Sequence, residues 1–261
     1  MQVTFDLISD LHLESWPDFD WTGQATSPIC VVAGDVSRDP ILLMNALNQL
    51  SRCYHAVFYI DGNEEHKNNM LTLGNSYRDL SHMVNSVKNV TFLQDNVVVI
   101  DGVAIIGTNG WWGFDLDPNL DMGQSMQWYK DNVGVPVDPA SILAMSRTDA
   151  AYLINSIQRL QTHNDVRKIA IVTHTVPGAD LIDHDIELCD TWNFNCMGNR
   201  LLRLAHNADT EKKIHTWCFG HYHGNVDRII DNVRYVNNCR GKGNTNWSRS
   251  VYYPKRITID F

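Results

Sequence analysis

The chain has 261 residues, of which 44% are hydrophobic and 20% charged, and its formal net charge is −9. This length and composition exclude a disordered protein and are sufficient for one full hydrophobic core, so we expect a single domain over residues 1–261. The negative charge argues against broad attraction to nucleic acid, because non-specific binding depends on Lys and Arg. No stretch approaches the roughly 20 apolar residues of a membrane span, and no signal-peptide pattern opens the chain, so we expect a cytoplasmic protein with no membrane partner.

The N-terminal half alternates short apolar runs with segments of helical spacing. Residues 3–8, 29–33 and 56–60 predict buried strands, and residues 40–50 and 70–84 predict helices. This β-α-β-α-β rhythm favours a largely parallel sheet.

A hairpin, a long loop and further strands are predicted beyond residue 96. Asp101-Gly102 divides two apolar runs, which is typical of a β-hairpin. Residues 108–139 are expected to form a loop-rich segment, and residues 141–160 a helix. Strands are predicted at residues 169–173, 214–219, 226–230, 233–237 and 257–260, with Asp231-Asn232 as a turn. Two packed sheets with helices outside them would accommodate these elements.

Six cysteines are scattered along the chain without a Cys-x-x-Cys pair: Cys30, Cys53, Cys189, Cys196, Cys218 and Cys239. Several lie in apolar, strand-like runs. We therefore expect reduced and mostly buried thiols, with disulfides or a zinc site as the alternatives.

Side chains that can bind a metal follow the predicted strands at five places. They are Asp10, His12, Asp35, Asn63, His174, His221 and His223. Each alone has an ordinary explanation as a helix cap or a turn residue. Together they can converge, because the carboxyl ends of strands in an α/β sheet share one edge. Carboxylate, imidazole and amide ligands suit divalent Mn, Fe, Zn or Ni, and an Asp can bridge two ions.

The order and spacing of these residues resemble the signature of the calcineurin-like metallophosphoesterase superfamily. In this chain the signature reads Asp10-Leu11-His12, Gly34-Asp35, Gly62-Asn63, Thr173-His174 and Gly220-His221-Tyr222-His223. The resemblance implies an α/β fold, a four-layer αββα sandwich of two mixed β-sheets flanked by helices. It also implies a phosphoric ester hydrolase.

The family pattern further implies a binuclear metal centre, with Mn expected first and Fe, Zn or Ni as alternatives. Carried over by position, Asp10, His12 and His223 would hold one ion, Asn63, His174 and His221 the other, and Asp35 would bridge them. In such a site a bridging metal-bound hydroxide attacks the phosphorus, so no side chain needs to become a covalent nucleophile.

One position departs from the family pattern. Most members have His after the Asn of the third motif, whereas this chain reads Gly62-Asn63-Glu64-Glu65-His66. A Glu beside two metal ions should be ionised, and it would then repel the oxyanion of the substrate instead of donating a proton. Three hypotheses are open: His66 takes over the catalytic role, Glu64 binds a metal or its water, or the site works without a general acid. The alternative for His66 is a surface histidine in a polar loop.

Three further residues are candidates for substrate binding. Arg38 could pair with a phosphate, or could form a solvated ion pair. Trp111 and Trp112 could stack on a nucleobase, and the alternative is an aromatic patch buried beneath the long loop.

These observations together predict a metal-dependent phosphohydrolase, a phosphomonoesterase or a phosphodiesterase, that acts on a small nucleotide-like substrate. The candidate catalytic residues are Asp35, Asn63, Glu64, His66 and His174. The alternatives are a nuclease, which the net charge disfavours, a protein phosphatase, and a degenerate scaffold that kept the fold but lost the reaction. The ester preference and the oligomeric state stay open.

Overall fold

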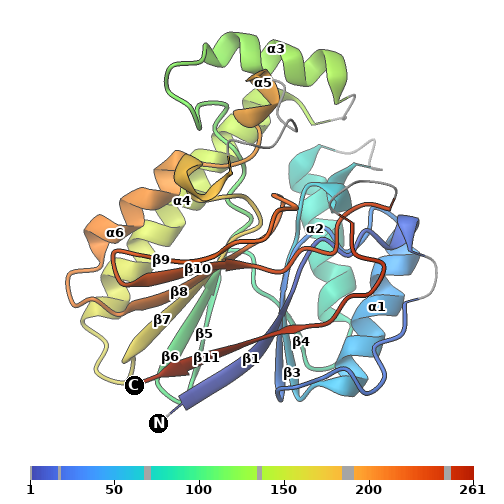
Figure 1. The fold of residues 1–261 in the computed structure, drawn as a ribbon, viewed down its shortest axis with the longest axis vertical. Coiled ribbons are helices and arrows are strands. Elements are labelled where there is room, and N and C mark those ends of the chain that lie inside the picture. Colours follow the sequence, from blue (N-terminus) through green and yellow to red (C-terminus); the bar gives the residue numbers. More distant parts are fainter. Residues whose placement is uncertain (1, 17–18, 68–71, 134–136, 184–190, 244–247) are drawn as a thin grey trace.

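Two β-sheets pack face to face, and helices cover their outer faces (Figure 1). The computed structural model describes residues 2–16, 19–67, 72–133, 137–183, 191–243 and 248–261. The predicted fold class, an α/β sandwich of two mixed sheets flanked by helices, is confirmed.

The first sheet has the strand order β11-β1-β2-β3-β4. Its strands are β1 (Gln2–Ile8), β2 (Ile29–Ala33), β3 (Ala56–Ile60), β4 (Val90–Phe92) and β11 (Lys255–Asp260). Strands β1 to β4 are mutually parallel, as the β-α-β-α-β rhythm predicts, while β11 pairs antiparallel with β1 at the edge. The sequence analysis did not predict β4, which has only three residues.

The second sheet has the order β5-β6-β7-β8-β10-β9. Its strands are β5 (Asn96–Ile100), β6 (Val103–Gly107), β7 (Lys168–Val172), β8 (Ile214–Phe219), β9 (Asp227–Ile230) and β10 (Val233–Asn237). The β5–β6 hairpin turns at Asp101-Gly102, where both residues have positive φ, 47° and 86°. Both are the left-handed angles that a tight two-residue hairpin needs, so the predicted turn is confirmed.

The α-helices of the described residues are α1 (Pro40–Cys53), α2 (Leu73–Asn85), α3 (Met122–Asn132), α4 (Pro139–Gln161), α5 (Thr191–Phe194) and α6 (Ala205–Ala208). Helices α1 and α4 each begin with Pro after an Asp cap, Asp39 or Asp138, whose carboxylate accepts hydrogen bonds from backbone N–H groups of the first turn. These caps satisfy donors that a helix start otherwise leaves without partners. Helix α3 lies inside residues 108–139, so the expectation of a loop-rich segment there is wrong over this helix.

Side-chain alternation along the strands divides the core into three apolar layers. On β3, Val57 and Tyr59 face α1 and α2, whereas Phe58 and Ile60 face the other sheet. The second sheet repeats this pattern, and its outer side chains pack against α4 and α6. Because alternate residues of a strand point to opposite faces, continuous apolar strands can supply both an inter-sheet layer and an outer layer. The resulting order, helices, sheet, sheet, helices, is visible in Figure 1.

Five cysteines in the described part of the chain are free: Cys30, Cys53, Cys196, Cys218 and Cys239. All but Cys53 are buried, which confirms the expectation of mostly buried thiols for these five. Cys189 lies outside the described residues.

Candidate metal centre

The seven predicted ligands lie at the carboxyl ends of five strands from both sheets. The loop after β1 carries Asp10 and His12, and the loops after β2, β3 and β7 carry Asp35, Asn63 and His174. The loop after β8 carries His221 and His223. Since these strands run parallel within each sheet, their carboxyl ends meet at one edge of the sandwich, as expected.

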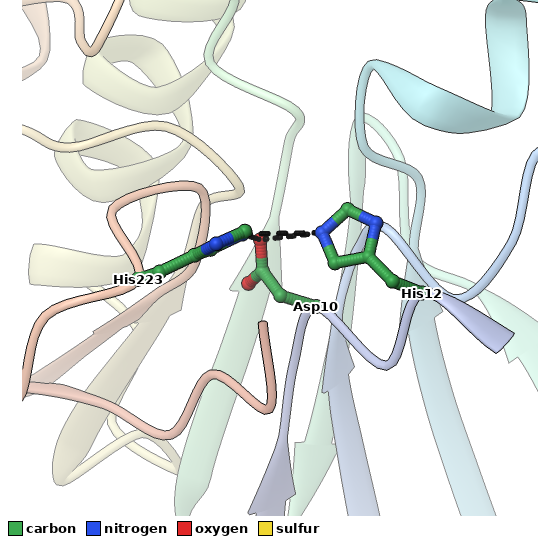
Figure 2. A group of neighbouring side chains, drawn as sticks. All are labelled: Asp10, His12 and His223. Carbon is green, nitrogen blue, oxygen red and sulfur yellow. Dashed lines mark hydrogen bonds and ion pairs between the residues drawn. The ribbon is translucent and has the colours of Figure 1, made fainter. Parts of the chain in front are cut away.

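Asp10, His12 and His223 form the first cluster (Figure 2). Nε2 of His223 lies 3.2 Å from Oδ1 of Asp10 and 3.1 Å from Nε2 of His12. Two imidazole nitrogens that bind one ion at about 2.0–2.1 Å are separated by roughly this distance. The geometry of this cluster therefore fits a single bound cation.

Asp35, His174 and His221 form the second cluster. Nε2 of His174 lies 3.4 Å from Oδ1 of Asp35 and 3.2 Å from Oδ1 of Asn63. The other Asp35 oxygen, Oδ2, lies 3.8 Å from Nε2 of His12 in the first cluster. The two oxygens of Asp35 thus face different clusters, which is the position a bridging carboxylate requires.

Hydrogen bonds to backbone carbonyls orient the imidazole rings of the second cluster. Nδ1 of His174 lies 2.9 Å from the Ala33 carbonyl, so its Nε2 faces the cluster. Nε2 of His221 lies 3.1 Å from the Cys196 carbonyl, and the ring of Trp112 stacks on His221 at 5.5 Å. Ring nitrogens that donate to backbone carbonyls fix the tautomer and leave the opposite nitrogen to accept a metal.

The electrostatics of the clusters favour positive charge. Burial alone would raise the pKa of Asp10 and Asp35, but neighbouring histidines hold both carboxyls below their usual range. Burial would lower the pKa of His174, yet Asp35 outweighs it and raises that pKa to about 10. Burial and the charge of His174 lower the pKa of His221 to about 3, which keeps its imidazole neutral. Ionised carboxylates and the neutral imidazole of His221 are in the forms that bind a cation, whereas the His174 ring would have to release its proton when a metal binds.

Four of the predicted ligands have a left-handed backbone: Asp10, His12, Asp35 and His221 have φ between 44° and 63°. This conformation is costly for residues with a Cβ and tends to concentrate at functional sites. Neighbouring glycines make room for the carboxylates of Asp35 and Asp10. A Cβ on Gly62 would overlap the Asp35 carboxylate, and one on Gly220 would overlap that of Asp10, which explains the Gly that precedes the ligands Asn63 and His221.

The clusters open into a cavity of about 160 Å³. Its lining includes His12, Asp35, Asn63, His221 and His223, together with the aromatic side chains of Trp112 and Tyr129. The side chain of His223 is 21% exposed, whereas Asp10 is fully buried, so the cavity reaches the ligands from the His223 side. A ligand in this cavity would lie directly against the candidate metal centre.

Glu64, the residue after Asn63, is buried beside both clusters. Its carboxylate lies within 4.8 Å of ligand atoms of His12 and Asp35, which form a third possible metal group with it. However, its Oε1 already pairs with two ammonium groups, Lys67 Nζ at 2.5 Å and Lys242 Nζ at 2.7 Å. Neither lysine belongs to a motif that the sequence reveals. The only sequence signal is the three-residue spacing of Lys67 from Glu64.

Glu65 is a second residue that the sequence analysis did not identify. Its carboxylate accepts backbone hydrogen bonds from Gly62 at 2.8 Å, Asp35 at 3.2 Å, Val36 at 2.7 Å and Ser37 at 3.4 Å. These donors belong to the loops after β2 and β3, which carry Asp35 and Asn63. Glu65 therefore joins the two loops that carry the predicted ligands Asp35 and Asn63.

His66 is buried, with 1% exposure, so the alternative of a surface histidine is wrong. Its Nε2 lies 2.9 Å from Oδ2 of Asp61, and its Nδ1 lies 2.7 Å from Oγ of Ser76. His66 is not among the residues that line the cavity at the clusters. Its catalytic role stays a prediction, but these contacts give the ring a structural role.

We expect His66→Ala to lower stability more than turnover. Loss of its two buried hydrogen bonds should reduce the free energy of unfolding by about 1–3 kcal/mol, as for other buried partners. Turnover should fall by far less than the roughly 10²- to 10⁴-fold that removal of a general acid costs. Urea denaturation and steady-state kinetics measure both, with His82→Ala on the exposed face of α2 as the control. A kcat loss of that size with unchanged stability would instead identify His66 as the acid.

The candidate substrate-binding residues lie at different distances from the clusters. Arg38 is exposed and lines a separate pocket with Ser37 and Asp79, so the structure does not bring it to the cavity. Trp111 is 1% exposed, and its Nε1 donates to the Tyr77 hydroxyl at 2.7 Å. Trp112 lines the cavity, but it is 3% exposed and its ring stacks on a ligand. Both tryptophans belong to a buried aromatic cluster, as the alternative interpretation proposed.

Fold and site together define an α/β sandwich with a cluster of possible metal ligands at the carboxyl edge of its sheets. Solved structures share this fold. Phosphopantetheinyl hydrolase from Mycobacterium tuberculosis matches with a TM-score of 0.74 and 18% identity, over 98% of this chain and 96% of that chain. A protein described as a 5′-nucleotidase from Staphylococcus aureus matches with a TM-score of 0.50 and 12% identity, over 93% of this chain and 49% of that one.

A third solved structure with the same fold, GAP50, is described as the anchor in the inner membrane complex of Plasmodium. It matches with a TM-score of 0.50 and 11% identity, over 98% of this chain and 77% of that one. No protein-family model and no curated protein matches the sequence. At these identities the likeness establishes the fold, and function has to be argued from the site.

Among the described residues, no helix is both long enough and apolar enough to cross a membrane.

Proposed function

We propose that the protein is a metal-dependent phosphoric ester hydrolase with the calcineurin-like metallophosphoesterase arrangement. The observation that carries this proposal is the position of Asp35, whose two oxygens face two separate clusters of imidazole and carboxylate ligands. A buried group of this composition has no evident role in stability, because like-charged carboxylates and strained backbone both oppose folding. A pair of cations would compensate both carboxylates at once.

The residues present fit two divalent ions. The first would be held by Asp10, His12 and His223, the second by Asn63, His174 and His221, and Asp35 would contact both. Imidazole nitrogens and carboxylate oxygens suit Mn, Fe, Zn or Ni, and we retain Mn as the first candidate. When bound, two such ions lower the pKa of a water molecule and hold phosphoryl oxygens for in-line displacement.

The side chains of this chain prepare the site for that chemistry. The Ala33 and Cys196 carbonyls fix the rings of His174 and His221, so these ligands need little reorganisation. Trp112 covers one face of His221 and excludes water from it. Preorganised ligands of this kind stabilise developing charge without a further energetic cost at the moment of reaction.

The substrate that we propose is a small phosphorylated molecule, nucleotide-like in size. The cavity of about 160 Å³ admits a phosphoryl group, and Trp112 and Tyr129 border it. We further propose a cytosolic protein with one catalytic domain over residues 1–261. Free, buried thiols are typical of a reducing compartment.

The proposal is tested by metal removal and replacement. The chelated, desalted protein should hydrolyse neither p-nitrophenyl phosphate nor bis-p-nitrophenyl phosphate, and about two equivalents of Mn²⁺ should restore turnover of at least one ester. Metal content by mass spectrometry and p-nitrophenolate release are the measurements. Tight binding of two ions without turnover of either ester would favour a scaffold with this fold. Failure to bind any divalent metal would exclude the proposed centre.

A further inference from the structure

We propose that Arg240 and the aromatic residues around it form a binding site for a small organic oxyanion that carries a planar ring. The site is a pocket of about 240 Å³, which we call the Arg240 pocket, and residues 19–24 after β1 and 250–253 before β11 supply most of its walls. Within the described part of the chain, no residue lines both this pocket and the cavity at the predicted metal ligands. The inference therefore does not depend on the proposed hydrolase function.

Aromatic rings form one wall of the Arg240 pocket. The rings of Phe19 and Trp21 stack at 5.5 Å, and the ring of Tyr252 lies 6.2 Å from that of Trp21. Hydrogen bonds hold this wall in place. Trp21 Nε1 donates to the Tyr54 hydroxyl at 2.9 Å, and the Tyr252 hydroxyl donates to the Asn238 carbonyl at 2.6 Å. A preformed aromatic wall is typical of small-molecule sites and suits a planar ring.

Two large apolar side chains at the edge of the pocket are exposed to solvent. Val251 is 68% exposed and Tyr253 is 66% exposed, and both belong to the lining. A ring that lies against the aromatic wall would remove part of this apolar surface from water, which favours binding. The pocket thus offers apolar contacts both in its wall and at its edge.

The guanidinium group of Arg240 has no hydrogen-bond or ion-pair partner in the described part of the chain. Its Nε is buried, and its Cζ lies 4.5 Å from the centre of the Trp16 ring, which covers one face of the group. Arginine stays protonated in proteins, so this half-buried side chain carries a full positive charge. A charge without a counter-ion is costly to bury. An oxyanion would supply the missing partner, because two of its oxygens match the parallel N–H groups of a guanidinium.

The remaining polar groups of the pocket narrow the class of ligand. The Asp20 carboxylate is exposed and accepts from the Thr22 N–H at 2.9 Å, so water screens its charge. Gln24 Nε2 donates to the Asp20 carbonyl at 2.8 Å, while its buried Oε1 has no partner among the described residues. Buried polar atoms without partners are rare in native proteins. The pocket therefore suits an oxyanion whose ring also carries an N–H or O–H group.

Isothermal titration calorimetry with indole-3-acetate tests the site, since this probe has a carboxylate, a planar ring and a ring N–H. We expect one binding site with the same affinity in the chelated and the Mn²⁺-loaded protein, because none of the predicted metal ligands lines the Arg240 pocket. Indole-3-acetamide, which lacks the charge, and acetate, which lacks the ring, should bind at least about 10-fold more weakly. Indoxyl phosphate, titrated into the chelated protein, distinguishes a phosphate ligand from a carboxylate ligand.

Substitutions locate the binding. Arg240→Gln should weaken indole-3-acetate binding at least about 10-fold, as the loss of a charge-assisted hydrogen bond implies. Arg256→Gln, at an exposed position on β11, is the matched control and should change the affinity less than about 2-fold, as is usual for surface sites. Tyr253→Ser removes an exposed ring from the edge of the pocket, so it should weaken binding without unfolding the protein.

Circular dichroism and urea denaturation verify that each variant folds. Absence of binding at millimolar indole-3-acetate, equal affinity for indole-3-acetamide, or unchanged affinity in a folded Arg240→Gln variant would overturn the inference. Binding that requires Mn²⁺ would also overturn it, because the probe would then lie on the metal centre. Binding in the chelated protein that is lost in Arg240→Gln supports the site whether or not the Mn²⁺-loaded protein hydrolyses phosphate esters.

Discussion

Asp35→Asn is expected to abolish hydrolysis of both p-nitrophenyl esters and to lower the metal content. The substitution keeps the size of the side chain but removes the charge that faces both clusters, through Oδ2 to His12 and Oδ1 to His174. The loss of activity and of metal affinity should exceed the roughly 10- to 100-fold decrease that follows when a metal ligand loses its outer hydrogen-bond partner. Single-turnover rates and metal content by mass spectrometry measure the two effects.

The control for this substitution is Asp79→Asn, because Asp79 is exposed on α2 and undergoes the same change of charge. It should leave turnover and metal content unchanged. If Asp35→Asn kept two ions and most of its activity, the bridging position of this carboxylate would have no catalytic meaning. The binuclear proposal would then have to be abandoned.

The convergence of the predicted ligands could be predicted from the sequence, because these residues belong to short motifs at strand ends. Parallel strands with ordinary apolar patterns carry Asp10, Asp35 and His174 to a common edge, and no long-range information is needed to place them there. The two apolar layers of each sheet follow in the same way from continuous apolar strands. The position of these residues at the carboxyl ends of the strands could thus be predicted from local patterns.

Residues that act through tertiary contacts could not be predicted in this way. Lys242 lies 178 positions from Glu64 along the chain, and nothing local indicates that the two pair. His66 is a catalytic candidate because it follows the Gly62-Asn63 motif, but the direction of its ring is set by Asp61 and Ser76. Trp111 was similarly ambiguous, because stacking on a base and burial in a core require the same side chain.

Helix α3 shows a different reason why local composition can fail to predict secondary structure, since it lies within residues 108–139. Their composition predicts a loop, yet α3 begins at Met122 after the Asp121 cap. The helix is stabilised by packing, since Tyr129 of α3 contacts Trp112 and Phe114 of the preceding segment. Tertiary contacts of this kind override weak local preference, and they place Tyr129 in the wall of the cavity.

Glu65→Ala is expected to be the most destabilising single substitution near the site. The Glu65 carboxylate accepts from four backbone N–H groups in two loops, and its removal leaves these buried donors without that partner. Each unsatisfied buried donor costs about 1–3 kcal/mol, and partial entry of water should limit the total loss to about 3–5 kcal/mol. Urea denaturation of the metal-free protein measures this loss without a contribution from bound ions.

The same substitution should also weaken the metal centre, because Glu65 holds the loop of Asp35 against that of Asn63. The control is Glu211→Ala, which makes the same substitution at an exposed position before β8. It should change the free energy of unfolding by less than about 0.5 kcal/mol, as is usual for surface sites. Added Mn²⁺ should recover part of the stability lost in Glu65→Ala, since an ion that binds the folded state draws the two loops together. A variant as stable as the wild type, with metal affinity unchanged, would show that the two loops keep their positions without the Glu65 carboxylate.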